Sequence, residues 1–150
     1  MKLDSIDSIL DFAIEKEEDA FQFYNDLAGK MQRPHMKQIF EQFAKEEKGH
    51  KAKLQAVKEG KLLMPAQQKV MDLKIGDNLV DVELDAEIDY QQALILAMKA
   101  EKAAYKLYND LAAATDDHNL RATFLTLAQE EAKHKLRFEV EYDEYVLKDN

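Results

Sequence analysis

A glutamate followed three positions later by a histidine occurs twice in the chain, once in the segment EEKGH and once in the segment EEAKH. The pairs are Glu47 with His50 and Glu131 with His134. On an α-helix this spacing places both side chains on one face. Carboxylate oxygens and imidazole nitrogens are ligands of Fe, Mn and Zn, so the two pairs predict a metal site if the fold brings them together.

A longer internal repeat surrounds the two pairs and becomes visible when the chain is aligned with itself after a shift of 84 residues. The segment YNDLA at Tyr24 then coincides with YNDLA at Tyr108, and Glu17 coincides with Glu101. Each half of the chain therefore carries the same glutamate and histidine positions. Two such halves, related by a pseudo-twofold axis, predict one interior site to which both contribute.

Four long helices are predicted to position these residues. Gly and Pro are scarce, and they interrupt long runs of Ala, Glu, Lys, Leu and Gln, which are good helix formers. The predicted helices span residues 4–28, 34–59, 86–113 and 117–146. The predicted end signals are Gly29 after the first helix, Pro34 in the first turn of the second, Gly60 after the second, Asp85 as N-cap of the third, and Thr115 or Asp116 as N-cap of the fourth.

The fold class predicted from these elements is all-α, a four-helix bundle made of two repeated hairpins. The short links within residues 4–60 and within residues 86–146 make each half an antiparallel hairpin. Residues 61–85 form a long crossover, which at about 3.3 Å per extended residue could span the length of the bundle or enter another subunit. A chain of 150 residues is expected to form a single domain, residues 1–150.

Glutamates interrupt the apolar stripe of every predicted helix, and in the second and fourth helices a histidine joins them. This pattern places four carboxylates and two imidazoles at one level of an apolar bundle, where unpaired charges of like sign are strongly unfavourable. Two divalent cations would balance four ionised glutamates, with the imidazoles bound as neutral ligands. The oxygen and nitrogen donors suit Fe or Mn, and Zn can substitute. The predicted ligands are Glu17, Glu47, His50, Glu101, Glu131 and His134.

Two further pairs of repeat positions lie close to the predicted ligands. Glu46 and Glu130 each stand four positions before a histidine, and we assign them to a place behind the ligands or at the surface, because the apolar stripe keeps its phase with Glu47 facing inward. Tyr24 and Tyr108 follow the predicted ligands of their helices by two turns. They either hydrogen-bond the ligand carboxylates from outside the metal site or serve as plain core aromatics.

Composition excludes several classes of partner and chemistry. The formal net charge of -9, without a basic cluster, argues against nucleic acid and against an anionic membrane surface. The absence of cysteine excludes disulfides, thiolate catalysis, cysteine-ligated zinc and iron-sulfur or rubredoxin-type iron. The first residues, MKLDSIDSILDF, are interrupted by aspartates and match neither a secretory signal nor a membrane span, so we expect a cytoplasmic protein.

The six predicted ligands resemble, position by position, the donor set of ferritin-like di-iron or di-manganese proteins, in which two helices supply one Glu each and two supply Glu-x-x-His. The chain resembles the rubrerythrin-related branch of that superfamily over nearly its full length, including the long crossover. The resemblance implies a ferritin-like four-helix bundle with a non-haem diiron centre that reacts with hydrogen peroxide or dioxygen.

The chain also departs from the typical members of that branch. Rubrerythrins typically carry an additional Glu three residues after the ligand of the third helix, where this chain has Ala104, and Ala20 stands at the matching repeat position. We therefore expect a symmetric site with six ligands. Typical rubrerythrins also contain a rubredoxin domain, which a chain without cysteine cannot form, so a separate electron donor is expected.

Several functions remain open because they require the same ligands. The first hypothesis is a diiron peroxidase that holds two Fe ions and reduces hydrogen peroxide, with Mn or Zn as substitute metals. The alternatives are a ferroxidase that oxidises Fe(II) with dioxygen, a protein that binds or buffers iron without turnover, and a bundle whose metals serve stability alone. We expect a homodimer, in which the crossover either stays within one chain or exchanges between two.

Overall fold

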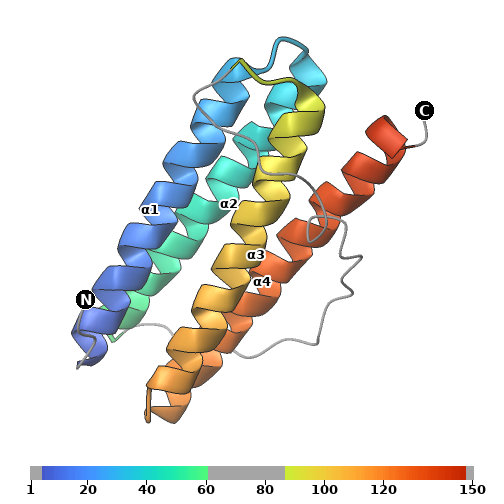
Figure 1. Ribbon diagram of the computed structural model, residues 1–150. Coiled ribbons are helices and arrows are strands. Elements are labelled where there is room, and N and C mark those ends of the chain that lie inside the picture. The colour runs from blue at the N-terminus through green and yellow to red at the C-terminus, as the bar shows by residue number, and fades with distance from the viewer. Residues whose placement is uncertain (1–4, 61–86, 148–150) are drawn as a thin grey trace.

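In the part of the chain that the structure describes, four helices form a bundle in which neighbouring helices run antiparallel (Figure 1). The computed structural model describes residues 5–60 and 87–147, and this part of the chain contains no strand. The helices, each of 25 residues, are α1 (Ile6–Lys30), α2 (Pro34–Lys58), α3 (Tyr90–Ala114) and α4 (His118–Tyr142), and α4 continues into a short π-helical turn, η2 (Asp143–Leu147). The all-α four-helix bundle predicted from the sequence is confirmed. The predicted crossover, residues 61–85, lies outside the described residues.

Short polar side chains cap the N-termini of three of the helices. Ser5 caps α1, and Asp89 caps α3 in a capping box with Gln92, in which each side chain accepts a hydrogen bond from the other's backbone N–H. Asp117 caps α4. In α2, Pro34 occupies the first turn, where its missing N–H leaves no hydrogen bond unmade.

Several predicted helix ends are wrong by a few residues. The first helix runs through Gly29 to Lys30, because Gly29 keeps helical geometry. The N-cap of α4 is Asp117 and neither Thr115 nor Asp116, because the Asp117 carboxylate is the group that accepts the Leu120 N–H. 

Of the remaining helix ends, the glycine predicted after α2 is found in place, whereas α3 begins later than predicted. Gly60 follows the end of α2 and has a φ of 76°, a left-handed conformation that glycine adopts without strain. Asp85 lies outside the described residues, and α3 begins after Asp89. The regular α-helical part of α4 ends at Tyr142, earlier than predicted.

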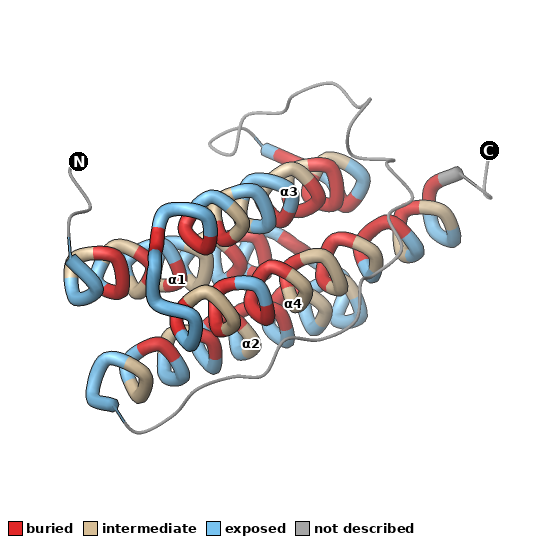
Figure 2. The backbone as a smooth tube through the Cα atoms, turned by 90° about the horizontal axis from the view of Figure 1, so that it is seen from below, coloured by how far each residue is buried: buried red, intermediate tan, exposed pale blue. Residues whose placement is uncertain are grey.

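The backbones approach closely within each hairpin, α1 with α2 and α3 with α4, and more distantly between hairpins. The buried side of every helix faces the centre of the bundle (Figure 2). Large side chains fill the space between the hairpins. Rings of Tyr24, Phe40 and Phe138 lie within 6.4 Å of one another, so α1, α2 and α4 meet in one aromatic cluster.

Within residues 5–60 and 87–147, the core consists of two apolar clusters with a polar layer between them. One cluster contains the second half of α1, the first half of α2, the first half of α3 and the end of α4. The other contains the opposite halves of the same helices. The predicted ligands lie in the sequence intervals between these two sets, so the apolar clusters close the polar layer from both ends. Among the described helices, none is long and apolar enough to cross a membrane.

Candidate metal centre

All six residues predicted as metal ligands are buried in the polar layer, and none is more than 5% exposed. Each occupies a core position of its helix. In α4, for example, Leu127, Glu131, His134 and Phe138 follow one another at steps of three or four residues and are all buried. The helical period that builds the core therefore also turns the polar groups inward.

The six residues form two overlapping groups of four, in each of which the candidate ligand atoms lie within 4.8 Å of one another. The two groups share Glu47 and Glu131, which come from α2 and α4. The groups are Glu17, Glu47, His50 and Glu131, and Glu47, Glu101, Glu131 and His134. A pair of ions bound here would have one carboxylate from each hairpin between them.

The two histidines face each other across the bundle with Nδ1 turned toward the shared glutamates. Nδ1 of His50 lies 2.9 Å from Oε1 of Glu131, and Nδ1 of His134 lies 2.9 Å from Oε1 of Glu47. The imidazole rings are parallel within 4°, with centroids 5.5 Å apart. Each histidine thus contacts the shared glutamate of the other hairpin, as the pseudo-twofold repeat requires.

Whether a metal fits this site can be judged from the buried nitrogen and oxygen atoms that make no hydrogen bond. Each of the six residues contributes at least one buried nitrogen or oxygen atom that makes no hydrogen bond with the described residues, and the 2.9 Å contacts of the two Nδ1 atoms are close approaches without hydrogen-bond geometry. Buried polar atoms are nearly always satisfied in folded proteins. Cations would satisfy these atoms together, and a set of oxygen and imidazole donors suits Fe, Mn or Zn, so the residues present fit a metal centre.

Two buried tyrosines hold the glutamates that the groups do not share. The Tyr24 hydroxyl donates to Oε1 of Glu101, and the Tyr108 hydroxyl donates to Oε1 of Glu17. In both glutamates Oε2 is the atom left without a partner. Burial, together with the carboxylate charges, raises the pKa of both phenols well above the ordinary value. Both tyrosines therefore stay protonated donors that fix one carboxylate oxygen and leave the other available.

The cluster retains protons when no cation balances its charge. Burial raises the pKa of the Glu47 carboxyl well above its ordinary value, and the charge of Glu101 raises it further. The same causes raise the pKa of Glu131. Burial alone would lower the pKa of His134, but the charge of Glu101 outweighs it and the pKa is raised. Burial also opposes ionisation of Glu101, yet the charge of His134 and the hydrogen bonds around it lower the Glu101 pKa.

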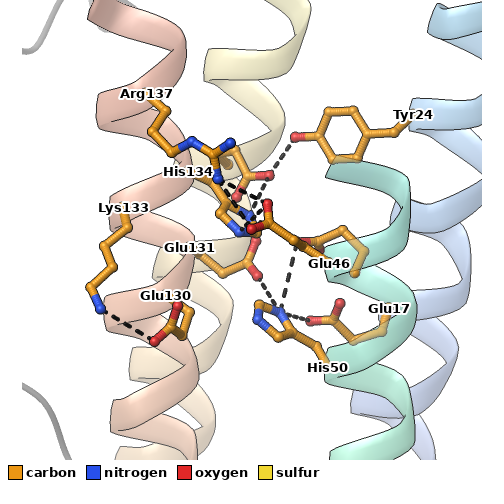
Figure 3. A network of polar contacts seen from close by, with 11 residues as sticks. Glu17, Tyr24, Glu46, His50, Glu130, Glu131, Lys133, His134 and Arg137 are labelled. Atoms are coloured by element: carbon orange, nitrogen blue, oxygen red, sulfur yellow. Dashed lines mark hydrogen bonds and ion pairs between the residues drawn. The ribbon is translucent and has the colours of Figure 1, made fainter. Parts of the chain in front are cut away.

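Glu46 and Glu130 belong to neither group of candidate ligands, and their side chains make different contacts (Figure 3). Oε2 of Glu46 lies 3.3 Å from Nε2 of His134, and Arg137 contacts both oxygens of Glu46. Oε1 of Glu130 lies 3.4 Å from Nζ of Lys133. The sequence did not point to Arg137, because its partner stands on the other hairpin and the two repeat halves carry different residues at this position.

Comparisons with known proteins agree with this architecture. Residues 8–142 match the family model of rubrerythrin. A solved structure of a hypothetical protein from Pyrococcus furiosus is similar, with 29% sequence identity over 93% of this chain and 89% of that chain, and a TM-score of 0.66. Among curated proteins, none matches this chain. With a family match that spans all four helices and the whole polar layer, the chain belongs to the rubrerythrin family.

Proposed function

We propose that the polar layer binds two iron ions and that the loaded protein reduces hydrogen peroxide. The observation that carries the proposal is the pair of overlapping four-residue groups with unsatisfied buried atoms. One group would hold one ion through its own glutamate and histidine, the other group would hold the second, and Glu47 and Glu131 would contribute to both. Two ions would also balance the four glutamate charges that the apolar surroundings disfavour.

The bound irons would supply the two electrons that, together with two protons, convert hydrogen peroxide into two molecules of water. The protein's own groups prepare the site for this step. Tyr24 and Tyr108 orient Glu101 and Glu17 through hydroxyl protons that both phenols retain. The apolar clusters at either end of the layer keep bulk water away from the ligands.

The electrons for repeated turnover are proposed to come from a separate donor, because a sequence without cysteine contains no rubredoxin-type centre. Supplying reduced rubredoxin or a small-molecule reductant to the loaded protein should sustain peroxide consumption. Consumption that stops after one equivalent of peroxide with every donor would favour an iron-binding protein without turnover.

The choice of oxidant tests the proposal. Iron-loaded protein is reduced without oxygen, mixed with equal concentrations of hydrogen peroxide or dioxygen, and followed by the absorbance of the ferric product. Peroxide should reoxidise the centre at least about tenfold faster, a difference of roughly 1.4 kcal/mol in barrier. Equal rates with the two oxidants would overturn the preference for peroxide.

A ferroxidase, for which Fe(II) is the substrate and dioxygen the oxidant, is the second candidate. The observation that favours it is Ala104, which stands where typical rubrerythrins have an additional glutamate, so that a carboxylate is missing beside Glu101. Multiple turnovers of added Fe(II) with dioxygen alone would assign the protein to this class.

A further inference from the structure

The internal repeat makes the two proposed metal positions equal in their ligands. Each has one glutamate of its own, one histidine of its own, and the two shared glutamates. The surroundings of the two histidines are unequal. The difference lies at the ring nitrogen Nε2, on the side of each imidazole that faces away from the shared glutamates.

Behind His134, four side chains from α2 and α4 contact one another in a closed circuit, of which Figure 3 shows Glu46, His134 and Arg137. Oε2 of Glu46 lies 3.3 Å from Nε2 of His134, and Nη1 of Arg137 lies 3.1 and 3.0 Å from the two oxygens of Glu46. The Arg137 guanidinium in turn lies 4.4 Å above the ring of Phe43. Phe43 meets the His134 ring edge to face at 4.9 Å, which completes the circuit.

Behind His50 this arrangement is absent among the described residues. The repeat counterpart of Glu46 is Glu130, and its carboxylate contacts Lys133. The His50 contacts with carboxylates all involve Nδ1. The counterpart of Arg137 is Lys53, an exposed residue.

The sequence itself fixes this difference. Lys133, which engages Glu130, has Gly49 as its repeat counterpart, so α2 has no lysine at the position from which Lys133 contacts Glu130. Leu127 stands where the other half has Phe43, so the aromatic support for an arginine is missing as well. The inequality therefore follows from residue types in the two halves and is not a matter of side-chain rotation alone.

The different surroundings of Nε2 in the two histidines should give the two positions different metal affinities. A histidine that binds a metal through Nδ1 carries its proton on Nε2, and a carboxylate that accepts this proton fixes the tautomer and the ring and strengthens the nitrogen donor. Such partners typically change metal affinity by about 10- to 100-fold. Glu46, with Oε2 3.3 Å from Nε2, is placed to be this partner for His134, whereas no carboxylate of the described residues contacts Nε2 of His50.

We infer that Glu46, held in place by Arg137, is a positioning residue for His134 and makes the two metal positions unequal. The position formed by Glu101 and His134 with the shared glutamates binds its ion first and more tightly. The position formed by Glu17 and His50 binds second. This inference rests on the proposed two-metal centre.

The test is an anaerobic titration of the full chain with Mn²⁺, in which free Mn²⁺ is counted by electron paramagnetic resonance. The wild type should bind two ions in two steps of different affinity. Glu46→Gln should weaken the tighter step by about tenfold or more, because a neutral amide is a poorer acceptor for the imidazole proton. The matched control at the repeat position, Glu130→Gln, should leave both steps unchanged.

A second measurement separates positioning from a merely structural role. In protein loaded with Co²⁺, the imidazole N–H protons of metal ligands are shifted away from the other resonances. The His134 proton should exchange slowly with water in the wild type and much faster in Glu46→Ala. Arg137→Lys, which keeps the charge but loses the planar group over Phe43, should give an intermediate exchange rate.

The outcomes discriminate between this inference and the proposed function. Two Mn²⁺ steps that Glu46→Gln does not change, or an equal loss in Glu130→Gln, would overturn the inference and leave the metal centre intact. Failure of the folded wild type to bind any Mn²⁺, Co²⁺ or Fe²⁺ would overturn the proposed function and the inference together.

Discussion

Glu47 and Glu131 are the carboxylates that both proposed metal positions share, and burial raises the pKa of each well above its ordinary value. A shared carboxylate must lose its proton before it can bind an ion. Protons and metal ions therefore compete for the same two residues. Metal affinity should rise with pH, whereas the metal-free protein should respond to pH in the opposite direction.

The first prediction concerns the stability of the metal-free protein. Folding raises the pKa of three groups, Glu47, Glu131 and His134, above the unfolded values of 4.5 for glutamate and 6.5 for histidine. The protonated form of such a group stabilises the fold, so its contribution is complete below the unfolded pKa and is lost as pH rises through the folded pKa. Glu101 has a lowered pKa, so its opposing loss occurs only as pH falls below 4.5. The melting temperature without metal should therefore rise between pH 7 and pH 5.

Thermal melts of metal-free protein across this range check the prediction. The double variant with Glu47→Gln and Glu131→Gln is the control, because neutral amides of similar shape remove most of the pH dependence. A melting temperature that stays flat or falls from pH 7 to pH 5 in the wild type would mean that these carboxylates are not buried together in the metal-free state.

The second prediction distinguishes adjacent glutamates of α4. Glu131 is fully buried and belongs to both groups, whereas Glu130 belongs to neither and contacts Lys133. Glu131→Ala should abolish binding of the pair of ions, and Glu130→Ala should retain a capacity of about two ions per chain, the number that balances the four glutamates. Iron titration followed by separation of unbound metal measures both capacities. The reverse result would show that the inward face of α4 is assigned one residue out of phase.

At the scale of the helices, the period of apolar residues predicts interior positions better than it predicts ends. Glu17 and Glu101 could be assigned to the core from the sequence because each replaces an apolar residue in a stripe that is regular on both sides. An end depends on a single hydrogen bond, for which neighbouring residues compete. Three polar residues precede α4, and only the geometry shows that Asp117 accepts the Leu120 N–H.

The sequence could not predict contacts between hairpins for a related reason. The helical period predicts which face of α2 carries Glu46, but it does not predict which side chain of α4 lies opposite that face. Because Glu46 and Glu130 occupy equivalent repeat positions, the pattern treats them alike. Their different roles arise from Arg137 and Lys133, whose partners depend on the packing of α2 against α4.

The third prediction concerns the start of α4. Asp117→Ala should destabilise the protein by about 1 kcal/mol, because it removes the hydrogen bond to the Leu120 N–H. Asp116→Ala is the matched control and should change the free energy of unfolding by less than about 0.5 kcal/mol, as exposed positions without such a bond do. Chemical denaturation of both variants under the same metal-free conditions measures the difference. A larger effect at position 116 would contradict the cap assignment.

At the scale of the whole molecule, the polar layer is where the two hairpins meet between their two apolar clusters. Each proposed metal position takes three donors from one hairpin and one from the other. Binding of an ion therefore requires that the hairpins be docked. Any unfolding or separation of the hairpins destroys both positions.

The fourth prediction follows from this requirement. The complete site exists in the folded chain and not in the unfolded chain, so added Mn²⁺ or Fe²⁺ should raise the melting temperature progressively. The stabilisation should be about 2.7 kcal/mol when free metal reaches 100 times its dissociation constant. Mg²⁺, which prefers oxygen ligands, is the control and should have little effect at equal concentration. Melting curves recorded at increasing metal concentration check this. A melting temperature that is independent of Mn²⁺ and Fe²⁺ would contradict a site built from both hairpins.

Ions that join α1 and α2 to α3 and α4 would have the effect of a cross-link between distant parts of the chain. Small domains often obtain such a link from a disulfide, which this sequence without cysteine cannot form. The formation of a disulfide depends on the redox state of its compartment, whereas the formation of this link would depend on the supply of metal. In a cell, the lifetime of the folded chain would then rise and fall with the supply of the metal that the site binds.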